Sequence, residues 1–424
     1  MIPQEENDLL TRTGPGTPCG KLLRRYWQPA ALSAEMPPGG APKPIRLLGE
    51  NLVLFRDDQG RPGLLGLHCS HRGADLSYGR IEDGGLRCIY HGWLYDIHGR
   101  CLDQPGEPAG GGHRDSIRHP SYPCEEIGGL ILTYMGPGEP PVFPRYEIFL
   151  APDSHRTVDK TFYDCNYLQA HEGNLDPVHL SFLHRRLRAE GGDQAQKVRS
   201  SNASSNTLFA ADTAPAIEVE MTNFGFRIAT LRRTGPSEVY LRLSNFIYPN
   251  LAAVPAGGPG TAGEGYTINW QIPIDDLHSW NYIITFSRRQ PISSSGGDRT
   301  EKDADYIPVR NRANRYLQDR ESIKSKSFSG IATFTAMDTC ATETAGPIQD
   351  RTGENLATSD RAVVAFRKLL LKAIQNVEEG KDPPHLIRDR ASSRVPNLVV
   401  LSEAISGSVD WKEHARKRET EVVA

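Results

Sequence analysis

Residues 44–145 contain two similar segments, Cys69-Ser-His71-Arg-Gly-Ala-Asp-Leu and Cys88-Ile-Tyr-His91-Gly-Trp-Leu-Tyr-Asp. Each segment offers one thiolate and one imidazole, which are donors for a soft or borderline metal. Zinc accepts two Cys and two His, but zinc sites more often pair Cys with Cys and His with His. A [2Fe–2S] centre with Cys on one iron and His on the other fits better, because each loop then gives one ligand to each iron.

Short strand-like runs surround both segments, at residues 45–48, 52–55, 64–67, 86–89, 93–96 and 130–134. Gly, Pro, Asn and Asp lie between them, as in the stretch 57–62. Short strands with dense turns predict an all-β sandwich or small barrel over residues 44–145.

A second motif follows in the stretch 166–184, where Asp176, His179 and His184 form Asp-x2-His-x4-His. Non-heme Fe(II) oxygenases bind iron through two His and one carboxylate, and leave the other positions open. On an ideal helix, positions i and i+5 are about 140° apart, so a regular helix would not aim both histidines at one metal. The alternative is that the histidines, including the nearby His171, are ordinary helix residues. In that case Asp176 would be the N-cap of a helix over residues 177–189.

Together the two motifs resemble those of the Rieske non-heme iron aromatic oxygenases. The likeness is to the large (alpha) oxygenase subunit of the phthalate dioxygenase-type branch. The resemblance implies that Cys69 and Cys88 hold one iron of a Rieske cluster and that His71 and His91 hold the other. Such a cluster has a potential of roughly −150 to +300 mV and can pass electrons onward.

The resemblance also assigns the second motif. It implies that His179 and His184 bind a mononuclear Fe(II), and that Asp176 bridges to His91 of a neighbouring subunit. The third ligand is then a downstream carboxylate, and Met337-Asp338-Thr-Cys-Ala-Thr-Glu343 resembles the family's segment at this point. We expect Asp338 to be that ligand. The other candidates are Glu343, which ranks second, and Asp350, Glu354 and Asp360.

The remaining chain contains longer elements. Strand-like runs occur at 217–233, 238–248, 266–273 and 280–287, and residues 190–206 are expected to form a loop. From Ser359 apolar residues recur at helical spacing until Gly380, a typical C-terminal stop. The resemblance implies an α+β chain of three parts. These are a lead-in (1–43) packed on the catalytic domain, a Rieske domain (44–145), and a helix-grip catalytic domain (146–424) with an antiparallel sheet around a long helix.

The run 239–248 alternates, so that Tyr240, Arg242 and Phe246 share one face. A strand Arg usually faces solvent. Arg242 could instead bind an aromatic carboxylate as a bidentate clamp, and it falls where the resemblance places a carboxylate-binding Arg. Arg227, Arg232 and Arg233 are weaker candidates for the same role.

Composition limits the function classes. The 424 residues carry 49 Lys+Arg and 52 Asp+Glu, a formal net charge of −3. A nucleic-acid or membrane-surface protein would be expected to show a basic excess. No run of apolar residues is long enough for a membrane span. The seven Cys favour a reducing cytoplasm, and Cys19, Cys101, Cys124, Cys165 and Cys340 are expected to be ordinary thiols.

By the resemblance, the protein is the oxygenase component of a Rieske system, with one cluster and one Fe(II) per subunit. It would use O2 and electrons that originate from NAD(P)H and pass through a flavin/ferredoxin-type reductase. The reaction would hydroxylate or O-demethylate an aromatic, carboxylated compound. The expected assembly is a homotrimer or a dimer of trimers. The alternatives are a Rieske-type electron carrier and a zinc-binding regulatory protein without oxygenase activity.

Overall fold

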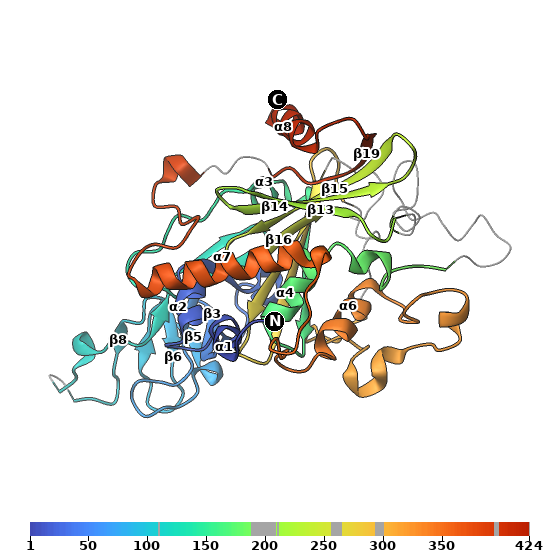
Figure 1. The fold of residues 1–424 in the computed structure, drawn as a ribbon. Helices are drawn as coiled ribbons and strands as arrows, with labels where there is room; N and C mark the ends of the chain where they lie inside the picture. Colours follow the sequence, from blue (N-terminus) through green and yellow to red (C-terminus); the bar gives the residue numbers. More distant parts are fainter. Residues whose placement is uncertain are drawn as a thin grey trace.

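The computed structural model describes residues 1–108, 111–187, 209, 212–255, 265–292, 301–393 and 398–423. The fold is α+β, as expected (Figure 1). An N-terminal part made of small β-sheets lies beside a larger antiparallel sheet that carries the long helices.

Three small antiparallel sheets form the N-terminal part. The first has the order β1-β11-β10, with bounds Trp27–Leu32, Leu130–Tyr134 and Cys124–Ile127. The second has the order β2-β3-β4-β9, with bounds Lys43–Leu47, Glu50–Arg56, Pro62–Gly66 and Ser121–Tyr122. The third has the order β5-β6-β7-β8, with bounds Arg80–Glu82, Gly85–Arg87, Leu94–Tyr95 and Cys101–Asp103. The expected short strands with dense turns are therefore present.

The first residues connect the two halves of the molecule. Helices α1 (Gln4–Thr11) and α2 (Pro18–Arg24) contact the long C-terminal helix α7. The next strand, β1, pairs with β11. Arg24 donates to Leu48 O and to Glu50, so the chain before β2 contacts both sheet systems.

The C-terminal part is an eight-stranded antiparallel sheet of order β12-β18-β17-β16-β15-β14-β13, in which β19 pairs with β15. The strands are β12 Arg156–Tyr163, β13 Ala216–Met221, β14 Gly225–Arg233, β15 Glu238–Ile247, β16 Leu251–Pro255, β17 Gly265–Pro273, β18 Ser279–Ser287 and β19 Leu401–Ser406. The expected run 217–233 is two strands, because a turn at residues 222–224 separates β13 from β14.

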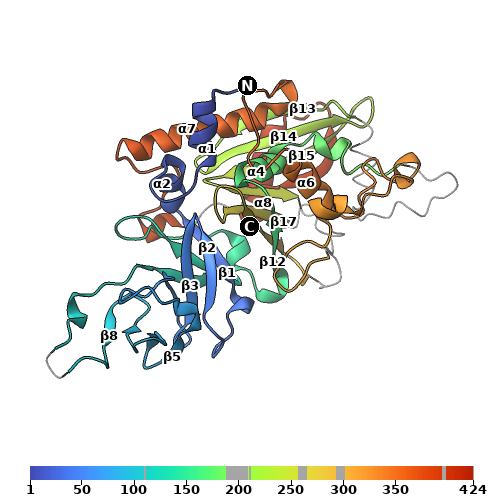
Figure 2. The same ribbon diagram turned by 90° about the horizontal axis from the view of Figure 1, so that it is seen from below.

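Helices α7 and α4 pack on this sheet on the side of the second motif. The expected helix after Ser359 is α7 (Arg361–Glu378), and Gly380 follows it with φ +76°. Its buried side chains, among them Phe366 and Leu370, join the core that contains Phe246 of β15. Helix α4 (Tyr167–Leu175) contacts α7 as well as β16 and β17. In Figure 2 helix α7 runs along the sheet on the side where the N-terminus lies. An antiparallel sheet packed around a long helix is the arrangement expected for residues 146–424.

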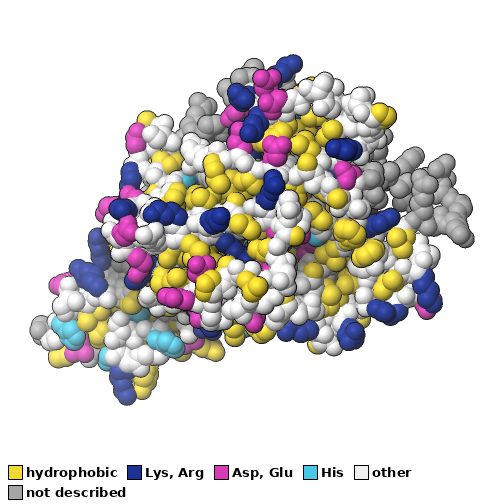
Figure 3. All heavy atoms as spheres, viewed as in Figure 1, with side chains coloured by type: hydrophobic (Ala, Val, Ile, Leu, Met, Phe, Trp, Pro, Cys, Tyr) yellow, Lys and Arg dark blue, Asp and Glu magenta, His cyan; other side chains and the backbone are white. Residues whose placement is uncertain are grey.

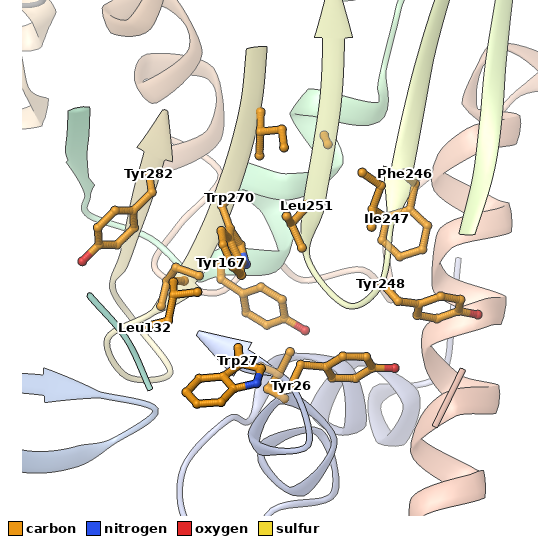
Figure 4. Close-up of a cluster of buried hydrophobic side chains, with 14 of the residues drawn as sticks. Tyr26, Trp27, Leu132, Tyr167, Phe246, Ile247, Tyr248, Leu251, Trp270 and Tyr282 are labelled. Carbon is orange, nitrogen blue, oxygen red and sulfur yellow. The ribbon is translucent and has the colours of Figure 1, made fainter. Parts of the chain in front are cut away.

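One core joins the lead-in to the catalytic sheet. Figure 4 shows Tyr26 and Trp27 facing Trp270 and Leu251 of the sheet. Trp27 Nε1 donates to Pro141 O at 2.7 Å. The two halves therefore bury apolar surface against each other.

The expected helix over residues 177–189 is wrong. Helix α4 ends at Leu175, and a 3-10 turn, His179–Ser181, follows. Pro177 disfavours helical geometry in the preceding residue, and Asp176 is extended, with φ −91° and ψ 110°. Asp176 accepts a hydrogen bond from Val178 N in a turn instead of capping a helix. The expected loop at 190–206 lies outside the described residues.

Among the elements whose bounds the structure describes, the further α-helices are α3 (Glu147–Leu150), α6 (Phe334–Glu343) and α8 (Trp411–Val423). Helix α6 contacts α4, which brings a distant stretch of chain to the second motif. Among the described residues, no helix is both long and apolar enough to cross a membrane.

Candidate metal centres

The two Cys-His segments form matching turns, one in the connection that follows β4 and the other between β6 and β7. Gly73 N donates to Cys69 O, and Gly92 N donates to Cys88 O. Both glycines have positive φ, +75° and +77°, a conformation that glycine adopts at little cost. A Cβ on Gly92 would lie 2.6 Å from Pro105. The shared turn places each Cys beside the His of its own loop.

The four side chains converge as the sequence predicts. The imidazoles of His71 and His91 have centroids 4.4 Å apart. Cys69 and Cys88 are 3% and 4% exposed and lie in one small core cluster. His71 stacks on Trp93 at 4.5 Å. The separation into a buried thiol pair and an outer imidazole pair suits a cluster with one iron on each pair.

The chemistry of these side chains fits a bound cluster. Burial raises the pKa of the Cys88 thiol, and the nearby Cys69 adds to the shift, so without a metal the protonated form of Cys88 is favoured. Metal binding deprotonates coordinating thiols. His71 Nδ1 is buried with no hydrogen-bond partner, as expected for an atom reserved for a metal. Tyr95 Oη lies 3.2 Å from Cys69 Sγ, a contact that sequence spacing did not indicate.

His179, His184 and Asp338 form the second donor set. They can offer one ligand atom each, all within 4.8 Å of one another. Asp338 Oδ1 lies 2.9 Å from His184 Nε2 and 3.8 Å from His179 Nε2. His184 Nε2 is buried and makes no hydrogen bond. Two imidazoles and one carboxylate, gathered this way, can hold Fe(II) on one face and leave other positions open.

Three elements bring these atoms together. The 3-10 turn after α4 carries His179, the following turn carries His184, and α6 carries Asp338. In a regular helix these two positions would be about 140° apart. Because they lie in turns instead, the ring centroids of His179 and His184 are 5.2 Å apart. Phe334 stacks on His184. Phe334 and His184 meet only in the folded chain, so the spacing of residues in the sequence did not indicate this contact.

The other downstream carboxylates lie elsewhere. Glu343 is buried and accepts hydrogen bonds from Tyr316 Oη and Asp164 N. Glu354 pairs with Arg367, and Asp350 accepts from Thr352. Asp360 accepts from the backbone of residue 357. The geometry therefore favours Asp338, the residue expected from the sequence.

Asp176 lies behind His179. Its Oδ2 is 3.7 Å from His179 Nδ1, while Oδ1 accepts from Val178 N. Burial disfavours the charged form of His179, but Asp176 and Asp338 outweigh it and raise the pKa of His179. The side chain of Asp176 remains 30% exposed, so a partner outside this chain can reach it.

Arg242 shares a face of the sheet with Tyr240 and Arg232, which pair across β14 and β15. The guanidinium carbons of Arg232 and Arg242 lie 5.0 and 5.9 Å from the ring centroid of Phe209. Arg232 donates to Pro177 O at 2.7 Å, which places this face beside the turn that carries His179. Neither Arg has a carboxylate partner within ion-pair distance among the described residues.

The two donor sets lie in different parts of one chain. Strands β5, β6 and β8 lie at one end of the molecule and α6 at the other (Figures 1 and 2). Histidine side chains reach the surface at the end formed by the small sheets (Figure 3). Ile89 and Tyr90, between Cys88 and His91, are 60% and 55% exposed. That surface can contact another protein.

Two family models match the chain. The Rieske [2Fe-2S] domain covers residues 26–123, and the LigXa C-terminal domain like family covers residues 133–424. The fold and both donor sets thus define a Rieske non-heme iron oxygenase.

Curated relatives match along nearly the whole length. The phthalate 4,5-dioxygenase oxygenase subunit of Pseudomonas putida is 35% identical over 98% of this chain and 95% of its own. The 5,5'-dehydrodivanillate O-demethylase oxygenase subunit of Sphingobium sp. is 31% identical over 97% of this chain and 90% of its own. The phenoxybenzoate dioxygenase subunit alpha of Ectopseudomonas oleovorans is 32% identical over 90% and 88%.

Among solved structures, dicamba monooxygenase bound to dicamba superposes with a TM-score of 0.59 at 18% identity, covering 85% of this chain and 99% of that one. The chain belongs to the phthalate dioxygenase-type Rieske oxygenases, as the oxygenase component. Its cofactors are a Rieske [2Fe–2S] cluster and a mononuclear iron. The electron-carrier and zinc-protein alternatives are not supported.

Proposed function

We propose that this oxygenase acts on an aromatic compound that bears a carboxylate. The observation that carries the proposal is Arg242, on the face that adjoins the His179 turn and without a carboxylate partner in the described chain. The relatives named for phthalate and phenoxybenzoate support it, since both names are those of aromatic acids. Arg242 would bind the carboxylate, and the aromatic side chains of this face would contact the ring.

The proposed ligands of the Rieske cluster come from the two Cys-His segments. Cys69 and Cys88 hold one iron of the cluster, and His71 and His91 hold the other, in line with the 4.4 Å separation of the imidazoles.

His179, His184 and Asp338 hold the mononuclear iron, supported by the convergence of their ligand atoms within 4.8 Å. A bound Fe(II) with open positions would supply the chemistry for O2 activation. The protein fixes the three donors on one side and holds the substrate by its carboxylate, so that one carbon faces the open side. Which carbon faces the iron decides between ring hydroxylation and loss of a methyl group.

Electron transfer is proposed to cross between subunits. Within one chain the donor sets lie at opposite ends, whereas Asp176 is partly exposed behind His179. The route would run from His91 of one chain through Asp176 to His179 of its neighbour. Such a head-to-tail contact must close into a ring, which favours a homotrimer or a dimer of trimers. A flavin/ferredoxin-type reductase would supply the electrons. The proposed division is 1–43, 44–145 and 146–424.

The test is turnover of a panel of aromatic acids, their methyl esters and methoxyaromatic acids, with a surrogate reductase and products read by mass. Substrate-dependent O2 uptake with added hydroxyl groups or loss of methyl is expected for the acids only. The His184→Ala protein is the matched control and should form no product. Equal turnover of acids and esters would contradict the carboxylate requirement.

A further inference from the structure

One face of helix α6 surrounds the imidazole of His184. Phe334, Met337 and Asp338 are at positions i, i+3 and i+4, which share a helix face. Each contacts His184: Phe334 through its ring, Met337 through sulfur and Asp338 through Oδ1. The helix thus supplies a proposed iron ligand and also contacts a second ligand from another segment.

The contact with Met337 reaches the nitrogen that points away from the iron set. His184 Nδ1 lies 3.2 Å from Met337 Sδ, and both side chains are buried. Nε2 is the nitrogen that lies 2.9 Å from Asp338 Oδ1, and a neutral imidazole that binds metal through Nε2 carries its proton on Nδ1. That N–H therefore donates to a thioether, which is a weak acceptor.

The ring of Phe334 stacks on the face of the His184 imidazole. The two rings are nearly parallel, at 4°, with centroids 3.5 Å apart. Phe334 is 48% exposed, whereas His184 is 4% exposed. A half-exposed Phe contributes little to the core. The main contact of Phe334 is therefore the stacking of its ring on one face of the His184 imidazole.

The two histidines of the set are therefore supported differently. His179 has the carboxylate of Asp176 behind Nδ1 at 3.7 Å, whereas His184 has a thioether at Nδ1 and an aromatic ring on its face. A carboxylate or carbonyl behind a ligating His raises its basicity and fixes its orientation. A thioether raises the basicity of the imidazole only weakly. The orientation of His184 therefore depends mainly on its contact with Phe334.

We propose that Met337 and Phe334 are positioning residues, which hold His184 in ligand geometry while keeping it a weaker donor to the iron than His179. The inference rests on the proposed iron ligands and deepens that assignment. It predicts that a stronger acceptor at position 337 tightens metal binding, and that loss of either contact loosens it.

The test measures Fe(II) affinity of the purified, cluster-loaded protein by competition with a chromogenic chelator. Met337→Leu keeps the volume but removes the acceptor, and should raise the dissociation constant at least about threefold. Met337→Gln offers an amide oxygen and should lower it by about three- to tenfold. Phe334→Leu should raise it at least about threefold. With Co(II) at the site, the ligand-field absorption should shift in Met337→Gln.

Matched controls are Met135→Leu, equally buried but remote from the iron set, and Phe328→Leu, 47% exposed and packed on Phe182 instead of an imidazole. Both should bind Fe(II) as the parent does. Each variant must retain the far-UV circular dichroism and urea unfolding midpoint of the parent, which report folding independently of the metal. Unchanged affinity in Met337→Gln and Phe334→Leu, with metal lost in His184→Ala, would overturn this inference alone. Metal retained in His184→Ala would overturn the iron-ligand assignment itself.

Discussion

The carboxylate oxygen Oδ2 of Asp176 lies 3.7 Å from Nδ1 of His179, on the side of the imidazole away from Asp338. The other oxygen of Asp176 accepts from Val178 N. One side chain thus shapes the turn and stands behind a proposed iron ligand. These two roles can be separated by experiment.

Asp176→Asn should keep the turn, because an Asn side chain accepts the same backbone hydrogen bond. It removes the charge behind His179, so steady-state turnover should fall by about 10- to 100-fold. Cluster and iron content should stay near those of the parent. In a single-turnover experiment the cluster should stay reduced. Near-normal turnover would mean that Asp176 only shapes the turn.

Mixed assemblies test the inter-subunit route. Cys69→Ser chains should lack the cluster and His184→Ala chains should lack the mononuclear iron, so each is expected to be inactive alone. Rings that contain both should recover part of the activity if electrons cross between neighbouring subunits. No recovery, despite mixing demonstrated by mass spectrometry, would count against the route.

Substitution of His179, His184 or Asp338 by Ala should remove the mononuclear iron and abolish product, because each can offer one of the three proposed donor atoms. The brown cluster should remain, since its proposed ligands lie in the N-terminal part of the chain. Glu343→Gln is the control: Glu343 is bound to Tyr316 and Asp164 N instead, and iron should be retained. If Glu343→Gln lost iron and Asp338→Ala kept it, the assignment of the carboxylate would be reversed.

Local patterns predicted the parts that depend on neighbouring residues. The Cys and His of each cluster loop are close in sequence, and the apolar stripe of α7 repeats within one helix, so both were foreseeable. The end of α4 was not, because Asp176-Pro177 can begin a helix as well as end one. Strand β16 (Leu251–Pro255) is short and was not among the expected runs.

Some contacts have no local signature. Phe334 covers His184, and Tyr95 reaches Cys69, only after the chain has folded. Similarly, the convergence of α6 on the His179 turn depends on packing between α4 and α6. Position 338 could be proposed from the sequence only through family resemblance.

Cys69→Ser and His71→Ala should each abolish the Rieske absorption, because each removes one of four proposed ligands. The catalytic sheet should stay folded, as its core extends from β12 to β18 and α7. Cys101→Ser is a suitable control, since Cys101 lies in the same small core cluster without a His partner in its loop. Iron and sulfide analysis, together with the visible spectrum, measures the outcome. A full cluster content in both ligand variants would refute the assignment.

Arg242→Met should raise KM for a carboxylated substrate by about 10- to 100-fold, which corresponds to a lost charged hydrogen bond. For the methyl ester of the same compound, Arg242→Met should change KM only slightly. Arg233→Met is the matched control, because Arg233 is exposed at the end of β14. Equal effects of Arg242→Met on acid and ester would show that Arg242 supports the fold and does not bind carboxylate.

Stability in acid should depend on His171. This side chain is fully buried between Phe246 and Phe366, and burial lowers its pKa from 6.5 to about 3. Between those values the unfolded chain binds a proton that the folded chain does not. Stability is therefore lost as pH falls below about 6.5, by up to about 1.4 kcal/mol per pH unit from this group.

His171→Leu removes that titration and fills similar space, so its stability should decline less between pH 7.5 and pH 5. The difference from the parent at pH 5 should reach about 2 kcal/mol. His385, whose pKa burial lowers to about 4, still titrates in the variant, so some acid sensitivity remains. Urea unfolding midpoints at both pH values measure the effect, with His98→Gln as the exposed control. A parallel pH dependence in parent and His171→Leu would show that His171 does not carry the acid sensitivity.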